Sequence, residues 1–152
     1  MSFNIECQEK EAAPVLSMRT RTPVSNLPSV LGEAYDLVAK YITEQGGEFV
    51  FAPFVAYYNM DMNDLDVEIG FPVKQALPGK GTIQPGVIPA GKQVTCFYKG
   101  PYEGLQAPYD AMAQWMKEKG LEPVGTSYEF YLNDPQQVPP EALETIIMFP
   151  VK

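Results

Sequence analysis

A four-residue sequence occurs twice in this chain of 152 residues and ends each half of it. Phe71-Pro-Val-Lys74 is identical to Phe149-Pro-Val-Lys152. Upstream of the two copies, Tyr57-Tyr58-Asn59 corresponds to Tyr131-Leu132-Asn133. In both halves the predicted elements follow the order strand, helix, strand, strand. Because this order recurs together with the matching residues, we infer an internal duplication.

The predicted repeats cover residues 1–74 and 91–152 of a single domain that spans residues 1–152. Between them, residues 74–91 contain three prolines and four glycines. This composition is typical of a chain segment that runs over the surface. Residues 75–90 are therefore predicted to be a connector between the repeats.

Apolar residues at three- and four-residue spacing predict one helix in each repeat. The first begins near Pro28 and ends at Gly46, and the second covers residues 102–119 and ends at Gly120. The segments that alternate as strands are residues 65–73, 93–99, 126–132 and 144–151.

One such unit cannot bury both a helix and a sheet face well by itself. The paired units are predicted to form an α+β fold, with a pseudo-two-fold antiparallel sheet and two helices on one face. We expect a ligand cleft between the halves.

Composition argues against several classes of function. Eleven basic residues against nineteen acidic ones give a net charge of −8, and no basic patch that would bind nucleic acid is visible. The chain has no histidine, which excludes histidine-based triads and histidine-rich zinc sites. Cys7 and Cys96 lack metal-ligand spacing and are expected to be free thiols. We predict no metal and no cofactor.

No apolar run approaches the length of a membrane span, and no signal peptide opens the chain. We therefore expect a cytoplasmic protein with no membrane partner. The acidic residues Asp61, Asp64, Asp66 and Glu68 do not have the spacing of a calcium loop and are expected to form a solvated rim.

Glu129 is a lone carboxylate within an aromatic strand, Thr126 to Leu132. No lysine or arginine lies between Lys119 and Lys152, so the local sequence offers no ion-pair partner. One interpretation places Glu129 on the solvent face of a half-exposed sheet. The other places it at the base of an aromatic pocket, where it would attract a cationic guest.

The two repeats differ at this position. When Asn59 is aligned with Asn133, Val55 stands opposite Glu129, so one half carries the charge and the other is apolar there. Tyr131 shares the face of Glu129 in a regular strand, and Tyr57 is its counterpart. For the helix residues, core packing is the alternative role, and Tyr98 could instead anchor the turn into the second helix. The predicted ligand-binding residues are Glu129, Tyr131, Tyr57, Trp115, Tyr35, Tyr109, Met112 and Tyr98.

Three stretches carry a resemblance to a known family: Leu65 to Val73, Tyr98 to Leu105 with the Trp115-containing helix after it, and Glu129 to Pro135. The chain resembles the GyrI-like effector-binding domains, the ligand-binding module of AraC- and MerR-type multidrug regulators. The resemblance implies the duplicated fold described above. It also implies that a glutamate matching Glu129 accepts lipophilic cations within an aromatic pocket. No helix-turn-helix segment precedes the domain, so the stand-alone form is expected.

Three functions remain open at this stage. The first is binding of small organic ligands, lipophilic and cationic, as a sensor or sequestering module. The second is hydrolysis of strained, electrophilic ring compounds, with Glu129 orienting or deprotonating a water. The third is interaction with a protein partner, such as a topoisomerase.

Overall fold

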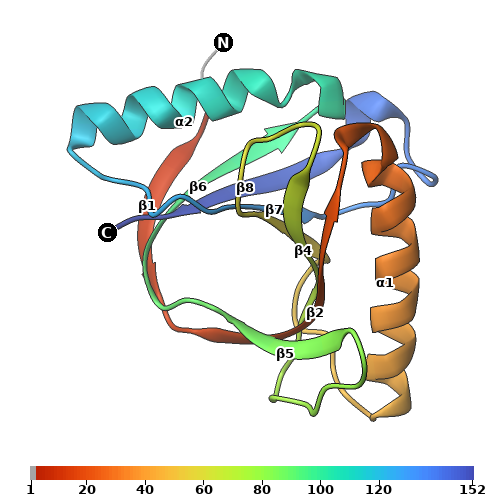
Figure 1. Cartoon of the computed structure of the whole chain (residues 1–152). Helices are drawn as coiled ribbons and strands as arrows, with labels where there is room; N and C mark the ends of the chain where they lie inside the picture. The colour runs from red at the N-terminus through yellow and green to blue at the C-terminus, as the bar shows by residue number, and fades with distance from the viewer. Residues whose placement is uncertain (1–2) are drawn as a thin grey trace. The chain divides into compact units, whose positions relative to one another are not determined.

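The computed structural model describes residues 3–152, which form two compact units (Figure 1). Residues Ala12–Pro89 make up the first, which we call the continuous unit. The second, the discontinuous unit, combines residues 3–11 with Ala90–Lys152.

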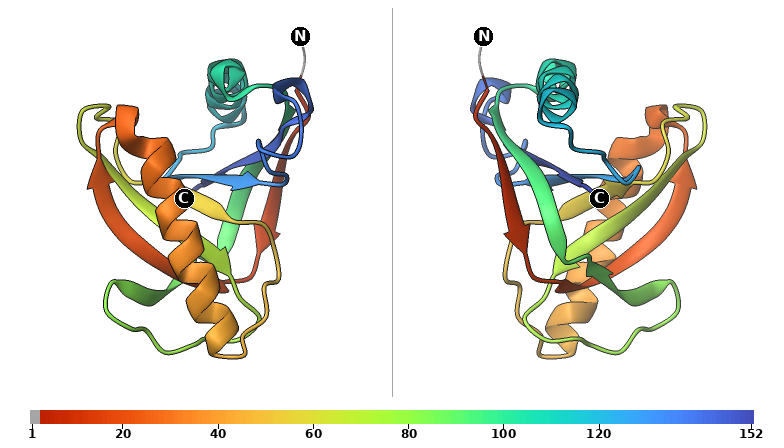
Figure 2. Two further views of the ribbon diagram at one scale, coloured as in Figure 1. Left: turned by 90° about the vertical axis from the view of Figure 1, so that its right-hand side faces the viewer. Right: turned by 90° about the vertical axis from the view of Figure 1, so that its left-hand side faces the viewer.

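The continuous unit contains one helix and a four-stranded antiparallel sheet. Its elements are β2 (Ala13–Thr22), α1 (Leu27–Glu44), β3 (Phe54–Tyr57), β4 (Leu65–Pro72) and β5 (Ile83–Ile88), and the strand order is β5-β2-β4-β3. α1 lies along one face of the sheet (Figure 2). On that face Leu16 of β2 packs with Val38 and Ile42 of α1, all fully buried.

The discontinuous unit has the same arrangement. Its elements are β1 (Ile5–Lys10), β6 (Gly91–Lys99), α2 (Gln106–Lys119), β7 (Ser127–Tyr131) and β8 (Glu144–Pro150), in the strand order β1-β6-β8-β7. Met112 and Met116 of α2 pack on Val94 and Cys96 of β6 and on Ile147 of β8. The α+β class and the duplication are thereby confirmed.

The repeated tetrapeptide makes the same backbone contact in both units. The amide of Val73 donates to the carbonyl of Pro14 at 2.9 Å, and the amide of Val151 donates to the carbonyl of Lys92 at 3.1 Å. Just after each helix, a glycine adopts a positive φ, 70° at Gly46 and 71° at Gly120. Residues with a β-carbon avoid this conformation, so glycine is the favoured helix end at both places.

The segment predicted to be a connector was assigned incorrectly. It contains β5, which pairs antiparallel with β2 from Ala13↔Ile88 to Met18↔Ile83. Pro85 and Gly86 are unfavourable in a central strand, so the sequence did not predict a strand here. Within its unit β5 pairs only with β2, and an edge strand of this kind tolerates proline. β5 occupies the edge of the continuous unit next to β2, and β1 occupies the equivalent edge of the discontinuous unit next to β6.

Two asparagines close equivalent loops in the two units. The side-chain amide of Asn59 donates to the carbonyl of Asp64 at 3.0 Å and accepts from the amide of Asp66 at 2.9 Å. Asn133 makes the same two bonds to the backbone before β8, at 2.8 and 2.9 Å. These bonds hold the start of β4 against the end of β3, and the start of β8 against the end of β7.

We predict that Asn59→Ala and Asn133→Ala each lower the free energy of unfolding by about 1–2 kcal/mol, because each removes two hydrogen bonds to backbone groups. Urea denaturation measures the change. The exposed Asn63, in the same loop as Asn59, is the control, and Asn63→Ala should change stability by less than about 0.5 kcal/mol. Equal effects at positions 59 and 63 would contradict the assignment.

Candidate functional site

Glu129 lies in the middle of β7, directly opposite Ile147 of β8, and only 6% of it is exposed. Tyr131, two residues along the same strand face, donates its hydroxyl to Glu129 Oε1 at 2.7 Å. Tyr109 of α2 donates its hydroxyl to the second oxygen, Oε2. The carboxylate is therefore enclosed between the sheet and the helix, and the interpretation as a solvent-facing residue is wrong.

The electrostatic environment of Glu129 is unusual because its partners are neutral. Among residues 3–152, no lysine or arginine forms an ion pair with it. Burial raises the pKa of Glu129 above its ordinary value, while the hydroxyls of Tyr109 and Tyr131 act in the opposite direction. Two hydroxyl groups replace only part of the hydration that a carboxylate loses on burial.

Further aromatic rings contact the two tyrosines that bind this carboxylate. Tyr102 contacts Tyr131 edge to face, with 5.6 Å between ring centroids, and Tyr109 contacts Phe149 in the same way at 5.7 Å. Burial and, second to it, the charge of Glu129 raise the pKa of Tyr102. We call Glu129 with Tyr102, Tyr109, Tyr131 and Phe149 the glutamate site.

Sequence reasoning did not place Tyr102 and Phe149 in this site. Tyr102, the first residue of the second predicted helix, was not among the predicted ligand-binding residues. Phe149 belongs to the repeated tetrapeptide, which was used only as a sign of duplication. Strand alternation places Phe149 on the same face of β8 as Ile147, which is two residues before it. Ile147 pairs with Glu129, so Phe149 and Glu129 lie on the same face of the sheet, but this pairing is visible only in the structure.

Three other predicted residues of this unit make contacts of a different kind. Met112 is fully buried in the core beneath α2, and the half-buried Trp115 packs against that core. Tyr98 donates its hydroxyl to the carbonyl of Pro101 at 2.8 Å and so anchors the turn into α2. A ligand-lining role for these three residues stays a prediction.

Tyr35 and Tyr57 belong to the continuous unit. Tyr35 donates its hydroxyl to the carbonyl of Phe54 at 2.9 Å, and its ring contacts Phe71 edge to face at 5.5 Å. Tyr57 ends β3, opposite Val67 of β4. Their role towards a ligand stays a prediction as well.

The strand registers show what has changed between the repeats. Val55 pairs with Ile69, and Glu129 pairs with Ile147, the residue that matches Ile69 when the tetrapeptides are aligned. The Tyr35–Phe71 contact corresponds to that of Tyr109 with Phe149. The continuous unit thus has the aromatic contact without the charge, since Val55 takes the place of Glu129.

Thr145 borders the glutamate site. It pairs with Tyr131 in the sheet, is fully buried, and its hydroxyl has no hydrogen-bond partner in the part of the chain that is described. A buried hydroxyl without a partner destabilises a fold by about 1–3 kcal/mol. This face of β8 therefore carries a second polar group whose hydrogen bonding is incomplete.

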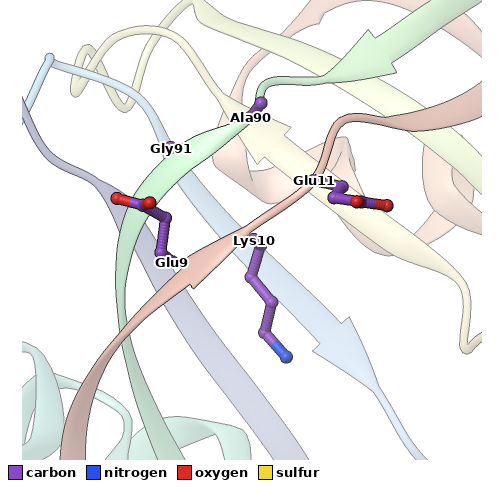
Figure 3. Close-up of a pocket in the computed structure, with 5 residues that line it drawn as sticks. All are labelled: Glu9, Lys10, Glu11, Ala90 and Gly91. Atoms are coloured by element: carbon purple, nitrogen blue, oxygen red, sulfur yellow. The ribbon is translucent and has the colours of Figure 1, made fainter.

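A surface hollow lies elsewhere in the discontinuous unit. It encloses about 620 Å³ and is lined by Glu9, Lys10, Glu11, Ala90 and Gly91. The three charged side chains point away from one another (Figure 3), so they do not converge on a ligand. Within residues 3–152, no group of three or more cysteine, aspartate or glutamate side chains could hold a metal ion. No helix in this part of the chain is long and apolar enough to cross a membrane.

The raised pKa of Glu129 predicts how stability depends on pH. A carboxyl whose pKa is raised by folding stabilises the fold fully below its ordinary value of 4.5, and this contribution is lost as pH rises through the folded-state pKa. Glu129→Gln cannot ionise. We therefore expect the stability of this variant, relative to the wild type, to increase as pH rises from about 4 to 8. Urea denaturation of both proteins across this range tests it, and a pH-independent difference would contradict it.

Comparison with known proteins places this geometry in context. No sequence of a curated protein matches the chain. The crystal structure of the EcmrR C-terminal domain is similar, with 24% identity and a TM-score of 0.85, over 100% of this chain and 99% of that domain. In an EcmrR–DNA complex the match has a TM-score of 0.86 and covers 99% of this chain but only 57% of the EcmrR chain.

Two more distant structures share the fold. A hydrolase from Listeria innocua has 17% identity and a TM-score of 0.73, over 97% of this chain and 91% of that one. SAV2435 bound to tetraphenylphosphonium has 10% identity and a TM-score of 0.69, over 100% of this chain and 94% of that one. At these identities the likeness shows the fold. The family model described as the GyrI-like small molecule binding domain matches residues 3–152, and the chain therefore belongs to this family.

Proposed function

We propose that the glutamate site binds lipophilic organic cations and that the protein acts as a sensor or sequestering protein for them. The observation that carries this proposal is the buried carboxylate of Glu129, whose two hydrogen bonds come from neutral tyrosine hydroxyls. A bound monocation would neutralise the one charge that the fold leaves uncompensated at this position.

The physical chemistry favours cations that are weakly hydrated and carry aromatic or aliphatic groups. Such a cation loses little hydration when it enters an apolar site, whereas a small, strongly hydrated ion loses much. A cation over an aromatic ring gains about 0.5–2 kcal/mol, and Tyr102, Tyr109 and Tyr131 provide rings next to the carboxylate. Exclusion of water strengthens the attraction to Glu129 further.

The comparisons support the choice of ligand class. The family is described as a small-molecule binding domain, and SAV2435, which shares the fold, is bound to tetraphenylphosphonium. Tetraphenylphosphonium is a monocation with four aromatic rings, and it has no hydrogen-bond donor. It is therefore the appropriate first probe.

We predict that Glu129→Gln weakens tetraphenylphosphonium binding by about 1.5–3 kcal/mol, the range for a lost interaction with a charged group. This corresponds to at least a tenfold increase in Kd. Glutamine has nearly the same shape, so the variant tests the charge without opening a cavity. Isothermal titration calorimetry at constant salt measures the change.

Two controls sharpen this experiment. The neutral triphenylphosphine oxide should bind the variant and the wild type equally, because its binding does not depend on the charge. Glu68→Gln alters a hydroxyl-bonded carboxylate in the continuous unit and should leave tetraphenylphosphonium binding unchanged. Unchanged affinity in Glu129→Gln would refute the proposal.

A second candidate function is hydrolysis of a strained, electrophilic ring compound at the same glutamate. The Listeria innocua hydrolase shares the fold, and a carboxylate whose pKa is raised is a stronger proton acceptor for a water. Incubation with an epoxide such as styrene oxide, followed by mass spectrometry, tests it. Hydrolysis by the wild type that is lost in Glu129→Gln would favour the enzyme, and no turnover above the protein-free rate would exclude epoxide hydrolysis.

A further inference from the structure

The continuous unit has a separate hollow, of about 290 Å³, that shares no residue with the glutamate site. It is lined by Ser17, Arg19, Glu68, Thr82, Gln84 and Pro85. In the sheet Ser17 is directly opposite Gln84, and Arg19 is directly opposite Glu68, so these four side chains share one face. This face is opposite to the one on which Leu16 packs against α1.

Glu68 is the organised carboxylate of this hollow. Ser17 donates its hydroxyl to Oε2 at 2.6 Å, and Tyr58 donates its hydroxyl to Oε1. Glu68 is half-buried, which corrects the expectation that it belongs to a solvated acidic rim. Its position therefore resembles that of Glu129, because both oxygens accept hydrogen bonds from neutral hydroxyls.

The arginine directly opposite Glu68 is engaged elsewhere. Arg19 makes two bonds to Asp66, at 2.6 and 2.8 Å, and its guanidinium lies 3.7 Å from the centroid of the Tyr58 ring. No lysine or arginine among residues 3–152 forms an ion pair with Glu68. Arg21 also pairs with Asp66, at 3.6 Å, and with Asp64, at 3.0 Å. The two arginines and the carboxylates of Asp64, Asp66 and Glu68 together have a net charge of −1, which leaves this face attractive to a cation.

The backbone of β5 leaves space beside this carboxylate. A β-carbon at Gly86 would lie 3.2 Å from Glu68 Oε2 and 3.3 Å from Cγ2 of Val15. Both distances are closer than ordinary contact, so any other residue would press on the carboxylate. Glycine at this position avoids this close contact with Glu68 Oε2.

We propose that this hollow is a second binding site, for a small hydrophilic molecule with a primary ammonium group. A primary ammonium has three N–H donors, and the hollow offers acceptors in the Glu68 carboxylate, the hydroxyls of Ser17 and Thr82 and the Gln84 amide. Arg19 covers a face of the Tyr58 ring, and Pro85 is the one apolar residue of the lining, so a lipophilic quaternary cation gains little here.

The size of the hollow fits the same class of ligand. A water molecule in the liquid occupies about 30 Å³, so about ten waters would fill this volume. An amino alcohol or a small diamine replaces several of them. The chemistry differs from that of the glutamate site, and the proposal does not depend on the function proposed there.

Ethanolammonium and choline form a matched pair of probes, because choline is the N-trimethyl form of ethanolammonium. In ¹H–¹⁵N NMR titrations of the full chain, ethanolammonium should shift the amides of Ser17, Thr82 and Gln84, with a Kd on the order of 1 mM. Choline, which has no N–H donor, should bind at least about tenfold more weakly.

Variants assign the site. Glu68→Gln should weaken ethanolammonium binding at least about tenfold, and Thr82→Val, which leaves both hydrogen bonds of Glu68 in place, should weaken it about two- to fivefold. Glu129→Gln should have no effect. The proposal is overturned if ethanolammonium causes no shifts at these amides, if choline binds equally well, or if neither Glu68→Gln nor Thr82→Val weakens binding. If ethanolammonium causes no shifts, the contacts of Glu68 serve only to hold β2 against β4.

Discussion

In each unit the strand that ends in the repeated tetrapeptide lies between two others, and this antiparallel pairing determines where the candidate side chains of the sheet lie. β8 pairs with β6 on one side and β7 on the other, and β4 pairs with β2 and β3 in the same way. Side chains alternate between the two faces of a sheet, so these registers bring Glu129, Tyr131 and Thr145 to one face. A shift by one residue would move the carboxylate to the opposite face.

Both candidate sites show how a fold can hold a carboxylate without an ion pair. In each, neutral hydroxyl groups donate to both oxygens, which orients the carboxylate without pairing it with a cationic side chain. The difference lies in the surroundings. Glu129 is buried and bound by Tyr109 and Tyr131, which contact further aromatic rings, whereas Glu68 shares its hollow with Arg19 and polar side chains. We therefore propose different ligands for the same functional group, a lipophilic cation at Glu129 and a hydrogen-bonding ammonium at Glu68.

The sequence was sufficient for features that depend on local pattern. The tetrapeptides predicted the duplication, helix periodicity predicted α1 and α2, and strand alternation placed Tyr131 beside Glu129. It was insufficient where tertiary contacts decide. The bond from Tyr109 to Glu129 depends on how α2 packs on the sheet, and Glu68 was indistinguishable from its solvated acidic neighbours. β5 was missed because the tolerance of an edge strand for Pro85 depends on its neighbours, which a local pattern does not reveal.

The division of one unit between two chain segments has a consequence for how the protein forms during synthesis. All residues of the continuous unit are available once Pro89 has emerged from the ribosome, and a unit of this kind can fold during synthesis. β1 is made first, yet its partner β6 begins only at Gly91. Until then β1 is a strand without its neighbour, and the unit that contains Glu129 is assembled last. A nascent chain would therefore form the surroundings of Glu68 before those of Glu129.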